Sequence, residues 1–540
     1  MAMTGADRLA DRLAKAGCRH AFGIPGGEVL ALVEALAKAG IVPVLVKHEN
    51  AGGFMAEGVW HAMSGQGICQ GRNTPALLYA TLGPGVANAV NVVANAMQDR
   101  VPLVFITGCV DASDAESYTH QVFDHAAMLG PIVKASFRAT AATAGLVADK
   151  AVRIALSGRP GPVHVDLPIS VAEGLSLEDM TPFTLPPAPA GPAQSPDLEA
   201  ARQLIVSARR PVMLAGLDVI NQGAAAAVAD VARRLSIPLV TTYKAKGILP
   251  EGHALALGAA GLSPKADTII LPLLNTSDCL ILVGYDPIEM RINWRNAWGN
   301  EAPVIDIVAE DMLHGMHSSQ HLFVGDIAAT LEALTTGVQP GPVWQDGELA
   351  RARAALGEAF APPPHWGPHA VFHGMRHALP PHTVITADSG AHRILLSQMW
   401  QCQAPRTMLQ SSGLCTMGCA VPLAAGYKLQ APHLPVCAFV GDAGLEMMLG
   451  DLATIRDLRL PVVMCVLVDE SLSLIEMKQR SAQRPNCAVD FGGTDFPGIA
   501  RAFGGHGVWI EDDETLAAEV QAALARDTFT LLACRTFGVV

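Results

Sequence analysis

Five short runs of aliphatic residues place the strongest constraint on how this chain folds. Stretches of helical character separate the runs VPLVFITG (101–108), PVMLAGL (211–217), DCLILVGY (278–285), VCAFVGD (436–442) and VVMCVLVD (462–469). The apolar residues are continuous rather than alternating with polar ones, so each run predicts a strand that is buried on both faces. Such strands are typical of parallel sheets covered by helices. We therefore predict an α/β fold built from open, doubly wound parallel sheets.

The length of the chain and two proline-rich stretches predict how these sheets are divided. At 540 residues the chain is too long for a single hydrophobic core. The stretch TPFTLPPAPAGPAQSP (181–196) and a second one at 337–364 contain enough proline to interrupt helices and sheets, which predicts exposed linkers. We expect three α/β domains, at 1–180, 190–335 and 365–540.

Composition excludes several classes of protein. Half of the residues are hydrophobic and 16% are charged, which indicates a large interior and a surface partly covered by other subunits. A net charge of −13 argues against a nucleic-acid partner, because phosphate binding needs a basic face. The 11 cysteines form no C-x-x-C pair, so we expect reduced thiols in the core. The first residues resemble neither a signal nor a transit peptide, and the apolar runs are too short to cross a bilayer, which predicts a cytoplasmic protein without membrane contact.

Two aspartates follow predicted strands in the third segment. Asp442 lies in GDAG (441–444) and Asp469 begins DES (469–471). In a right-handed crossover both strands end at the same edge of the sheet, so the two carboxylates are expected to lie close together. Carboxylate and diphosphate oxygens suit Mg²⁺ or Ca²⁺, and the helix after GDAG offers N–H groups to an anion. On spacing alone, each aspartate fits a cap of the following element as well.

This segment resembles the thiamine-diphosphate-dependent enzymes, and among them the acetolactate-synthase-like branch. The family motif is GDG or GDA, followed after the next strand by Asn-Asn or a variant. The resemblance implies that Asp442 and Asp469 bind Mg²⁺ through their side chains and Ser471 through its carbonyl group. Asp469 stands where the family usually has asparagine, which adds a negative charge beside the diphosphate. Further cofactor contacts implied here are Gly441, Ala443, Gly444 and Leu474.

Two other stretches of the third segment carry the same resemblance. ADSGAHR (387–393) resembles the family turn D-x-G-x-H, and SSGLCTMGCAVPLAAGYKL (411–429) resembles GGLGTMGFGLPAAIGA. The resemblance implies that Met417 supports the cofactor between its two rings, although core filling is the more common role of a methionine. Cys415 replaces a family glycine near the pyrimidine ring. The implied diphosphate contacts are Ser389, Gly390, Ala391 and His392.

The first segment contains a candidate for the group that activates the cofactor. IVPVLVKHENAGGFMAEGVWHAMSG (41–65) resembles the family stretch RHE-x-x-A-x-x-A-A-E-G-Y-A-R. By this resemblance Glu49 hydrogen-bonds N1′ of the aminopyrimidine and thereby promotes loss of the proton at C2 of the thiazolium. Without that context a helix cap would be the favoured explanation of Glu49. Matches at GIPGGEVL (23–30) and LGPGVANAV (82–90) imply a pyrimidine pocket made by Pro25, Gly83, Gly85 and Asn88.

Three residues are candidates for contact with the substrate. Gln121, in YTHQVFD (118–124), falls where the family has a glutamine facing the reacting carbon, and His120 replaces the family phenylalanine. A structural role fits His120 as well as a substrate role does. Lys478, in SLIEMK (473–478), stands where synthases of branched-chain precursors carry tryptophan in GMVMQW. We therefore expect an anionic substrate group at Lys478, with a solvated helix face as the alternative.

The central segment resembles the domain that holds FAD in acetolactate synthases and ADP or nothing in their relatives. No G-x-G-x-x-G follows any of its predicted strands, so a separate NAD site has little support. Lys244 and Lys246 replace apolar family residues and could pair with a nucleotide phosphate. FAD and ADP therefore remain candidate cofactors. Because the family builds each active site from two subunits, the resemblance also implies a homodimer at least, and commonly a homotetramer.

The predicted function is cleavage or formation of a carbon–carbon bond in a 2-oxo acid or related dicarbonyl compound. Thiamine diphosphate and Mg²⁺ are the expected cofactors, and the enzyme is expected to be a decarboxylase or carboligase. One alternative is a hydrolase that opens the ring of a cyclic 1,2-dione. Another is a non-catalytic binding module on the same scaffold, and the presence of Glu49, Met417 and Asp442 counts against it. The sequence does not identify the substrate.

Overall fold

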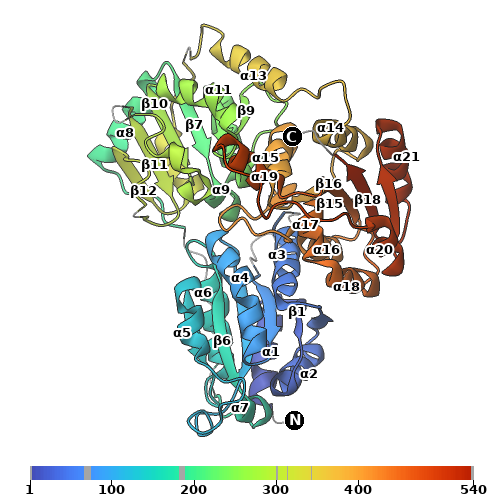
Figure 1. Cartoon of the computed structure of the whole chain (residues 1–540). Helices are drawn as coiled ribbons and strands as arrows, with labels where there is room; N and C mark the ends of the chain where they lie inside the picture. Colours follow the sequence, from blue (N-terminus) through green and yellow to red (C-terminus); the bar gives the residue numbers. More distant parts are fainter. Residues whose placement is uncertain are drawn as a thin grey trace.

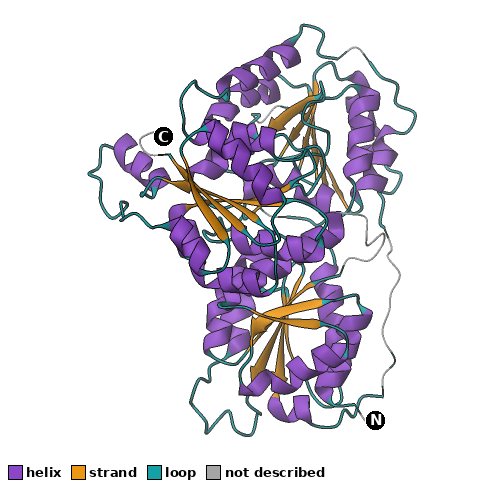
Figure 2. Cartoon of the chain, turned by 90° about the vertical axis from the view of Figure 1, so that its right-hand side faces the viewer, coloured by secondary structure: helices purple, strands orange, loops and turns teal. Residues whose placement is uncertain are grey.

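Three parallel sheets, each covered by helices, make up the computed structural model of the chain (Figures 1 and 2). It describes residues 3–65, 74–179, 181, 189–299, 302–312, 314–341 and 343–536. Within these ranges each sheet has six strands, and every pairing between named strands is parallel. The prediction of three doubly wound α/β units is confirmed.

The N-terminal sheet has the strand order β2-β1-β3-β4-β6-β5. Its strands are β1 (His20–Ile24), β2 (Val42–Leu45), β3 (Ala76–Ala80), β4 (Leu103–Cys109), β5 (Ala135–Arg138) and β6 (Val163–Pro168). Its helices are α1 (Gly5–Lys15), α2 (Leu30–Lys38), α3 (Glu49–Gly65), α4 (Pro84–Gln98), α5 (His125–Leu129), α6 (Ala144–Leu156) and α7 (Ile169–Glu173).

The central sheet has the order β12-β11-β10-β7-β8-β9. Its strands are β7 (Pro211–Ala215), β8 (Leu239–Thr241), β9 (Ala256–Ala259), β10 (Cys279–Val283), β11 (Val304–Val308) and β12 (His321–Val324). Its helices are α8 (Pro196–Ser207), α9 (Leu217–Asn221), α10 (Ala225–Leu235), α11 (Pro264–Asn275), α12 (Ile327–Thr335) and α13 (Glu348–Ala359).

The C-terminal sheet has the order β14-β13-β15-β16-β18-β17. Its strands are β13 (Val384–Ala387), β14 (Met408–Gln410), β15 (Val436–Gly441), β16 (Val463–Val468), β17 (His506–Ile510) and β18 (Thr530–Arg535). Its helices are α14 (Pro368–Ala378), α15 (Ala391–Met399), α16 (Ala420–Gln430), α17 (Asp442–Glu446), α18 (Leu452–Asp457), α19 (Ser473–Ser481), α20 (Phe496–Ala502) and α21 (Asp513–Leu524).

Burial explains why the aliphatic runs form strands. Every residue of β4, β10 and β16 is buried, since each of these strands lies inside its sheet with helices on both faces. The prediction of an exposed linker over 337–364 was wrong in part. Helix α13 lies inside that stretch, and the buried Trp344 donates a hydrogen bond from Nε1 to the carbonyl of Pro211 (2.7 Å). In the other predicted linker, 182–188 lies outside the described residues and Pro196 begins α8.

Helices α3 and α16 cross in direct backbone contact and join the N-terminal domain to the C-terminal domain. A Cβ atom on Gly58 would lie 2.2 Å from the carbonyl oxygen of Leu423, and one on Gly426 would lie 1.8 Å from that of Met55. Both positions therefore require glycine, because any side chain would force the helices apart. Apolar residues of both helices and both sheets form one continuous buried cluster. Figure 1 shows α3 beside α16 at the centre of the molecule.

A buried polar network near this crossing connects all three domains. Arg406 donates from Nη1 to Nδ1 of His61 (2.7 Å) and from Nη2 to Oδ1 of Asn221 (3.0 Å), and its guanidinium lies 4.5 Å from the ring centroid of Trp60. Because arginine has no acceptor, His61 accepts at Nδ1 and donates from Nε2 to Oε1 of Glu57 (3.2 Å). Burial lowers the pKa of Arg406 only to about 10, so the side chain stays charged at neutral pH.

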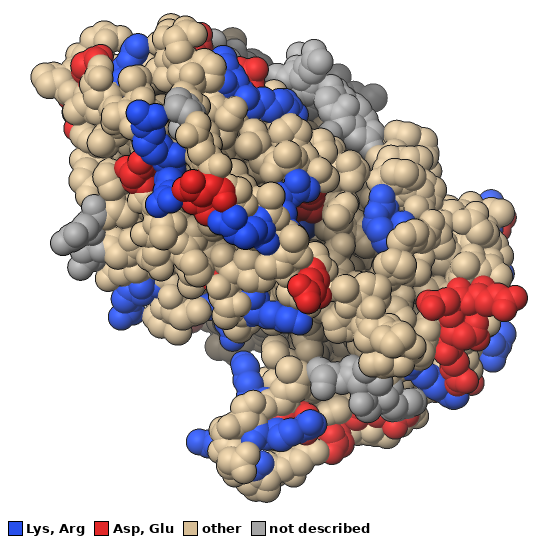
Figure 3. Space-filling view, turned by 90° about the horizontal axis from the view of Figure 1, so that it is seen from above, with Lys and Arg blue, Asp and Glu red and all other residues tan. Residues whose placement is uncertain are grey.

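The surface in Figure 3 shows Lys and Arg in small separate groups interspersed with acidic and uncharged residues, and no broad basic area on that face. Among the described residues, no helix has both the length and the apolar character that a membrane span requires.

We expect Arg406→Gln to lower the thermal midpoint strongly. Removing one partner from a buried charged network typically costs about 3–5 kcal/mol, because the remaining groups stay buried without compensation. Thermal unfolding followed by circular dichroism measures the effect. Arg456→Gln is the control, since Arg456 pairs with Asp457 on the surface, where such pairs contribute about 0–1 kcal/mol. Equal midpoints for the two variants would contradict the role assigned to the network.

Candidate active site

A buried carboxylate, Asp442, and a half-buried one, Asp469, lie at the carboxyl edge of the C-terminal sheet. Asp442 follows β15 and Asp469 follows β16, and the backbone N–H groups of Asp469 (3.0 Å) and Glu470 (2.8 Å) donate to Oδ2 of Asp442. Burial raises the pKa of Asp442 to about 6, and the charge of Asp469 adds to this rise, while the N–H of Glu470 opposes it. Burial also raises the pKa of Asp469. Two acidic groups this close, with raised pKa values, fit a site for a divalent cation.

The loop after Asp469 carries a further candidate ligand. The N–H of Ser471 donates to Oδ1 of Asp469 (3.3 Å), and the hydroxyl of Ser473 donates to Oδ2 of the same carboxylate. The hydroxyl of Ser471 is buried and has no hydrogen-bond partner among the residues that the structure describes. Leu474 is half-buried in the first turn of α19. The loop thus keeps polar atoms facing the carboxylate pair.

Two more buried polar atoms have no hydrogen-bond partner within the described part of the chain: the hydroxyl of Ser389, in the turn between β13 and α15, and Nε2 of His392, in the first turn of α15. His392 lies beside the end of β15, because a Cβ on Gly441 would be 3.5 Å from its ring. Burial and the neighbouring Arg393 lower the pKa of His392 to about 4, so the ring is neutral. Unpaired polar groups beside the amino end of α15, which Ala391 begins, fit an anion such as a diphosphate.

Asp388 organises this region, although the sequence prediction did not include it. The side chain is fully buried and accepts from the backbone N–H groups of Gly418 (2.9 Å), Cys419 (2.8 Å) and Ala420 (3.3 Å) at the amino end of α16. A Cβ on Gly444 would lie 2.1 Å from Oδ2 of Asp388, which explains the glycine. The sequence feature that could have identified Asp388 is its position directly after a strand, which Asp442 and Asp469 share.

Cys415 and Met417 lie on the segment that leads into α16. Cys415 has a φ of 57°, the left-handed region that favours glycine. Its thiol donates to the carbonyl of Ser412 (3.1 Å), and Nη2 of Arg393 donates to its sulfur (3.3 Å). These bonds hold the strained conformation that the family glycine would adopt freely. Met417 is half-buried.

One face of α4 holds this segment in place, and the sequence prediction missed it. Asn91 accepts from the hydroxyl of Thr416 (3.1 Å), and Asn95 accepts from that of Ser411 (2.6 Å). Asp99 accepts from the N–H groups of residues 412 and 413 (2.7–3.2 Å). These three polar side chains are spaced four residues apart along a largely apolar helix, and this spacing is the sequence feature that could have indicated their shared role.

Glu49 begins α3 and is 3% exposed. Nδ2 of Asn88 donates to its Oε2 (3.0 Å), and a Cβ on Gly85 would lie 3.2 Å from its Oε1. Gly83 has a φ of 67°, and a Cβ there would lie 2.5 Å from the carbonyl oxygen of Gln121. The structure therefore brings Glu49, Gly85 and Asn88 together and sets Gly83 against the loop of Gln121.

Besides Asn88 and Cys415, four predicted site residues are exposed in the single chain. Pro25 follows β1, His120 and Gln121 lie in the loop before α5, and Lys478 lies on α19. His120 contacts Tyr118 edge-on, with ring centroids 6.3 Å apart. None of these four side chains is enclosed by the residues that the structure describes.

A hollow of about 510 Å³ lies between the two halves of this site. His48 and Asn50, which flank Glu49, line it from the N-terminal domain together with Asn91. From the C-terminal domain it is lined by Leu414, Cys415, Thr416, Met417, Met447 and Met448. The two neighbours of Glu49 and the predicted cofactor support, Met417, therefore border the same space.

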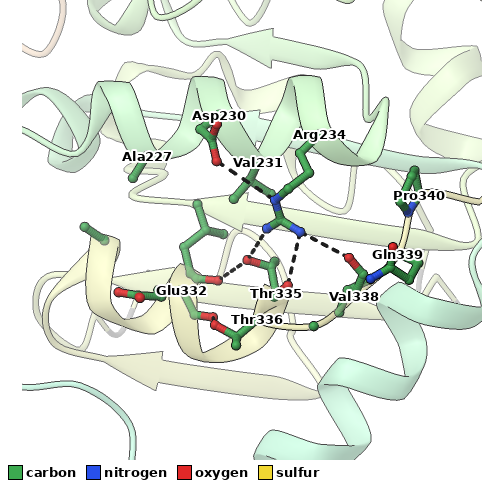
Figure 4. Close-up of a pocket in the computed structure, with 13 residues that line it drawn as sticks. Ala227, Asp230, Val231, Arg234, Glu332, Thr335, Thr336, Val338, Gln339 and Pro340 are labelled. Carbon is green, nitrogen blue, oxygen red and sulfur yellow. Dashed lines mark hydrogen bonds and ion pairs between the residues drawn. The ribbon is translucent and has the colours of Figure 1, made fainter.

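A second hollow, of about 590 Å³, lies between α10 and α12 in the central domain (Figure 4). Arg234 pairs there with Asp230 and donates to the backbone carbonyls of Thr335 (3.3 Å) and Val338 (3.2 Å). No predicted site residue lines this hollow. The guanidinium of Arg234 is already engaged by these partners.

Comparison with known proteins identifies the family. Three family models match: thiamine pyrophosphate enzyme, N-terminal TPP binding domain (residues 3–128), central domain (198–334) and C-terminal TPP binding domain (388–534). The acetolactate synthase isozyme 1 large subunit of Escherichia coli (strain K12) is 31% identical over 513 residues, which cover 93% of this chain and 88% of that protein. The chain belongs to the thiamine pyrophosphate enzymes.

Other similar proteins place the chain in one branch of the thiamine pyrophosphate enzymes. The acetolactate synthase of Bacillus subtilis (strain 168) is 29% identical over 524 residues, 95% of this chain and 90% of that protein. The acetolactate synthase of Mycobacterium leprae (strain TN) is 30% identical over 549 residues, 97% of this chain and 85% of that protein. The chain is therefore a thiamine-pyrophosphate-dependent enzyme of the acetolactate-synthase-like branch, of the carboligase or lyase type.

We expect Glu49→Gln to reduce turnover about a hundredfold or more, the typical effect of removing a positioned acid–base group, while the cofactor still binds. Turnover and thiamine diphosphate affinity are measured on the same preparation. Glu34→Gln is the control, since Glu34 pairs with Lys38 on the surface. Near-normal turnover of Glu49→Gln would rule out the role proposed for Glu49.

Proposed function

We propose that this enzyme breaks or forms a carbon–carbon bond beside the carbonyl group of a 2-oxo acid or related dicarbonyl compound, as a decarboxylase or carboligase. The proposal depends on one arrangement: residues beside the buried Glu49 border the same hollow as Met417. When bound, thiamine diphosphate would supply the nucleophilic carbon that adds to the carbonyl group and the positively charged ring that takes up the electrons of the broken bond. The chain itself supplies binding, orientation and proton transfer.

The C-terminal domain would hold the diphosphate and Mg²⁺. The carboxylates of Asp442 and Asp469 and the carbonyl of Ser471 are the proposed Mg²⁺ ligands. The unpartnered hydroxyl of Ser389 and Nε2 of His392 would contact the diphosphate. The remaining proposed cofactor contacts in this domain are Gly390, Ala391, Cys415, Met417, Gly441, Ala443, Gly444 and Leu474.

The N-terminal domain would hold the pyrimidine ring. Glu49 would keep a proton at N1′, and the hydrogen bond from Asn88 orients the Glu49 carboxylate for that task. Glycine at 83 and 85 leaves room for the loop of Gln121 and for Glu49 itself. Pro25 would close the pocket on one side, while His120 and Gln121 would face the substrate.

We also propose that the enzyme is a homodimer at least, most simply a homotetramer, located in the cytoplasm. The exposure of Pro25, His120 and Gln121 in a single chain supports a second copy that completes the site. Met447, which lines the hollow beside Met417, is 62% exposed, as expected of an apolar side chain that another subunit covers. The domain limits 1–180, 190–335 and 365–540 are part of this proposal.

Removing the metal is expected to release thiamine diphosphate, because the diphosphate and the two carboxylates are all negative and only a cation can join them. The enzyme is dialysed against EDTA, and the cofactor that remains after gel filtration is quantified. Adding Mg²⁺ and the cofactor together restores activity, and adding the cofactor alone does not. Full activity and full cofactor content after exhaustive dialysis would remove the support for this site.

A panel of 2-oxo acids and cyclic 1,2-diones tests the substrate class. We expect release of carbon dioxide from at least one 2-oxo acid. Turnover of a cyclic dione without carbon dioxide release would instead indicate a ring-opening hydrolase. If the folded, cofactor-loaded protein turns over no compound of either class, the proposal fails.

The same panel tests Lys478. We expect pyruvate with 2-oxobutyrate to be a poor pair, and Lys478→Trp to raise acetohydroxybutyrate formation, because a flat apolar side chain replaces a flexible ammonium group. Lys478→Met separates the loss of charge from the gain of an apolar wall. Efficient formation of this product by the wild-type enzyme would show that Lys478 does not set specificity.

A further inference from the structure

The central sheet contains a buried carboxylate at the place where such sheets bind nucleotides. Its strand order reverses direction between β7 and β10, and ligands of open parallel sheets bind beyond the carboxyl ends of the strands at such a switch point. Asp218 lies there, in the short helix α9 directly after β7, and is 1% exposed. Its backbone N–H donates to the carbonyl of Gly284, which follows β10 (3.1 Å).

The partners of Asp218 are groups that would otherwise bind a phosphate. Arg159 reaches over from the N-terminal domain, and its Nε (2.9 Å) and Nη2 (2.8 Å) contact Oδ2 of Asp218. The backbone N–H of Ala309, directly after β11, also donates to Oδ2 (3.3 Å). A guanidinium and a backbone N–H at a strand end are common partners of phosphate oxygens. The carboxylate therefore occupies an anion position.

The space around this carboxylate is filled by the chain itself. A Cβ on Gly216 would lie 2.5 Å from the carbonyl oxygen of Gly284, so the loops after β7 and β10 touch. Asp286, 1% exposed, pairs with Arg100 of the N-terminal domain (2.9 Å). Tyr285 is also buried and packs against Trp298, with ring centroids 6.3 Å apart.

The two lysines considered as phosphate partners are engaged elsewhere. Lys244 pairs with Asp99 (3.0 Å) and Lys246 with Glu251 (2.7 Å), and both lysine side chains are buried. The suggestion from the sequence that they could pair with a nucleotide phosphate does not fit these contacts. FAD and ADP each carry a diphosphate, which the carboxylate of Asp218 would repel.

We propose that the central domain binds neither FAD nor ADP, and that the Asp218 carboxylate takes the place of a nucleotide diphosphate between Arg159 and the N–H of Ala309. In this arrangement the ion pair, rather than a cofactor, joins the central domain to the N-terminal domain. The proposal is independent of the reaction proposed above, because it concerns binding that is measured directly.

The first test uses the wild-type protein. We expect no flavin fluorescence after denaturation of the purified enzyme, and no change of the thermal midpoint on addition of FAD or ADP. A nucleotide that bound the folded state would raise the midpoint by several degrees at saturation. Stoichiometric flavin in the purified enzyme, or a rise of the midpoint with FAD or ADP, would overturn the proposal.

The second test restores the anion site. Asp218→Ala removes the one carboxylate that the structure shows in direct contact with the buried Arg159, among the described residues. Inorganic pyrophosphate or ADP is therefore expected to bind this variant about tenfold more tightly than the wild type, and to raise its thermal midpoint. Asp218→Asn keeps the shape and loses the charge, and is used if the alanine variant does not fold. Titration calorimetry with pyrophosphate measures the affinity.

Asp267→Ala is the matched control. Asp267 is a buried carboxylate of the same domain, 2% exposed, and accepts from Nε1 of Trp294 (2.9 Å) and the N–H of Gly261 (3.1 Å). Its removal should destabilise the domain without creating an anion site. If folded Asp218 variants bind pyrophosphate no better than Asp267→Ala and the wild type, the carboxylate does not stand in for a diphosphate.

Discussion

The backbone contact between α3 and α16 is the constraint on which the candidate active site depends. Glu49 begins α3 nine residues before Gly58 (58 − 49 = 9), and Met417 precedes Gly426 by nine residues (426 − 417 = 9). Because the two glycines fix the helices against each other, the amino ends of both helices are held at a fixed separation. The proposed activating carboxylate, Glu49, and the proposed cofactor support, Met417, are thus positioned by one packing contact that lies far from both groups.

The segment that carries Cys415 and Met417 is held by hydrogen bonds from both the N-terminal and the C-terminal domain. The side chains on one face of α4 bind its residues from 411 to 416, and Asp388 caps the helix that follows. A loop that is fixed on both sides has little freedom to rearrange, so its conformation is set before a ligand arrives. The left-handed conformation of Cys415 is maintained by the same surroundings.

Features that depend on local sequence could be predicted, whereas those that depend on distant partners could not. The aliphatic runs identified β4, β7, β10, β15 and β16, since burial on both faces leaves a direct mark on the sequence. The two aspartates after β15 and β16 could be paired because parallel strands end at one edge. No local pattern revealed that Asp218 meets Arg159, 59 residues earlier.

Helix α13 was missed because flanking prolines outweighed ELARARAALGEA, whose residues favour helix. The roles of His120, Gln121 and Lys478 stay predictions, because one chain leaves them exposed.

The shared core also affects how the chain folds during synthesis. Helix α3 ends at Gly65, but its packing partner α16 begins only at Ala420, 355 residues later (420 − 65 = 355). At about 5–20 residues per second, a ribosome takes roughly 20–70 s to produce that intervening stretch. During this interval the apolar face of α3 that α16 later covers has no native partner. The N-terminal domain therefore completes its core after translation of most of the chain, and in the meantime it presents the kind of surface that chaperones bind.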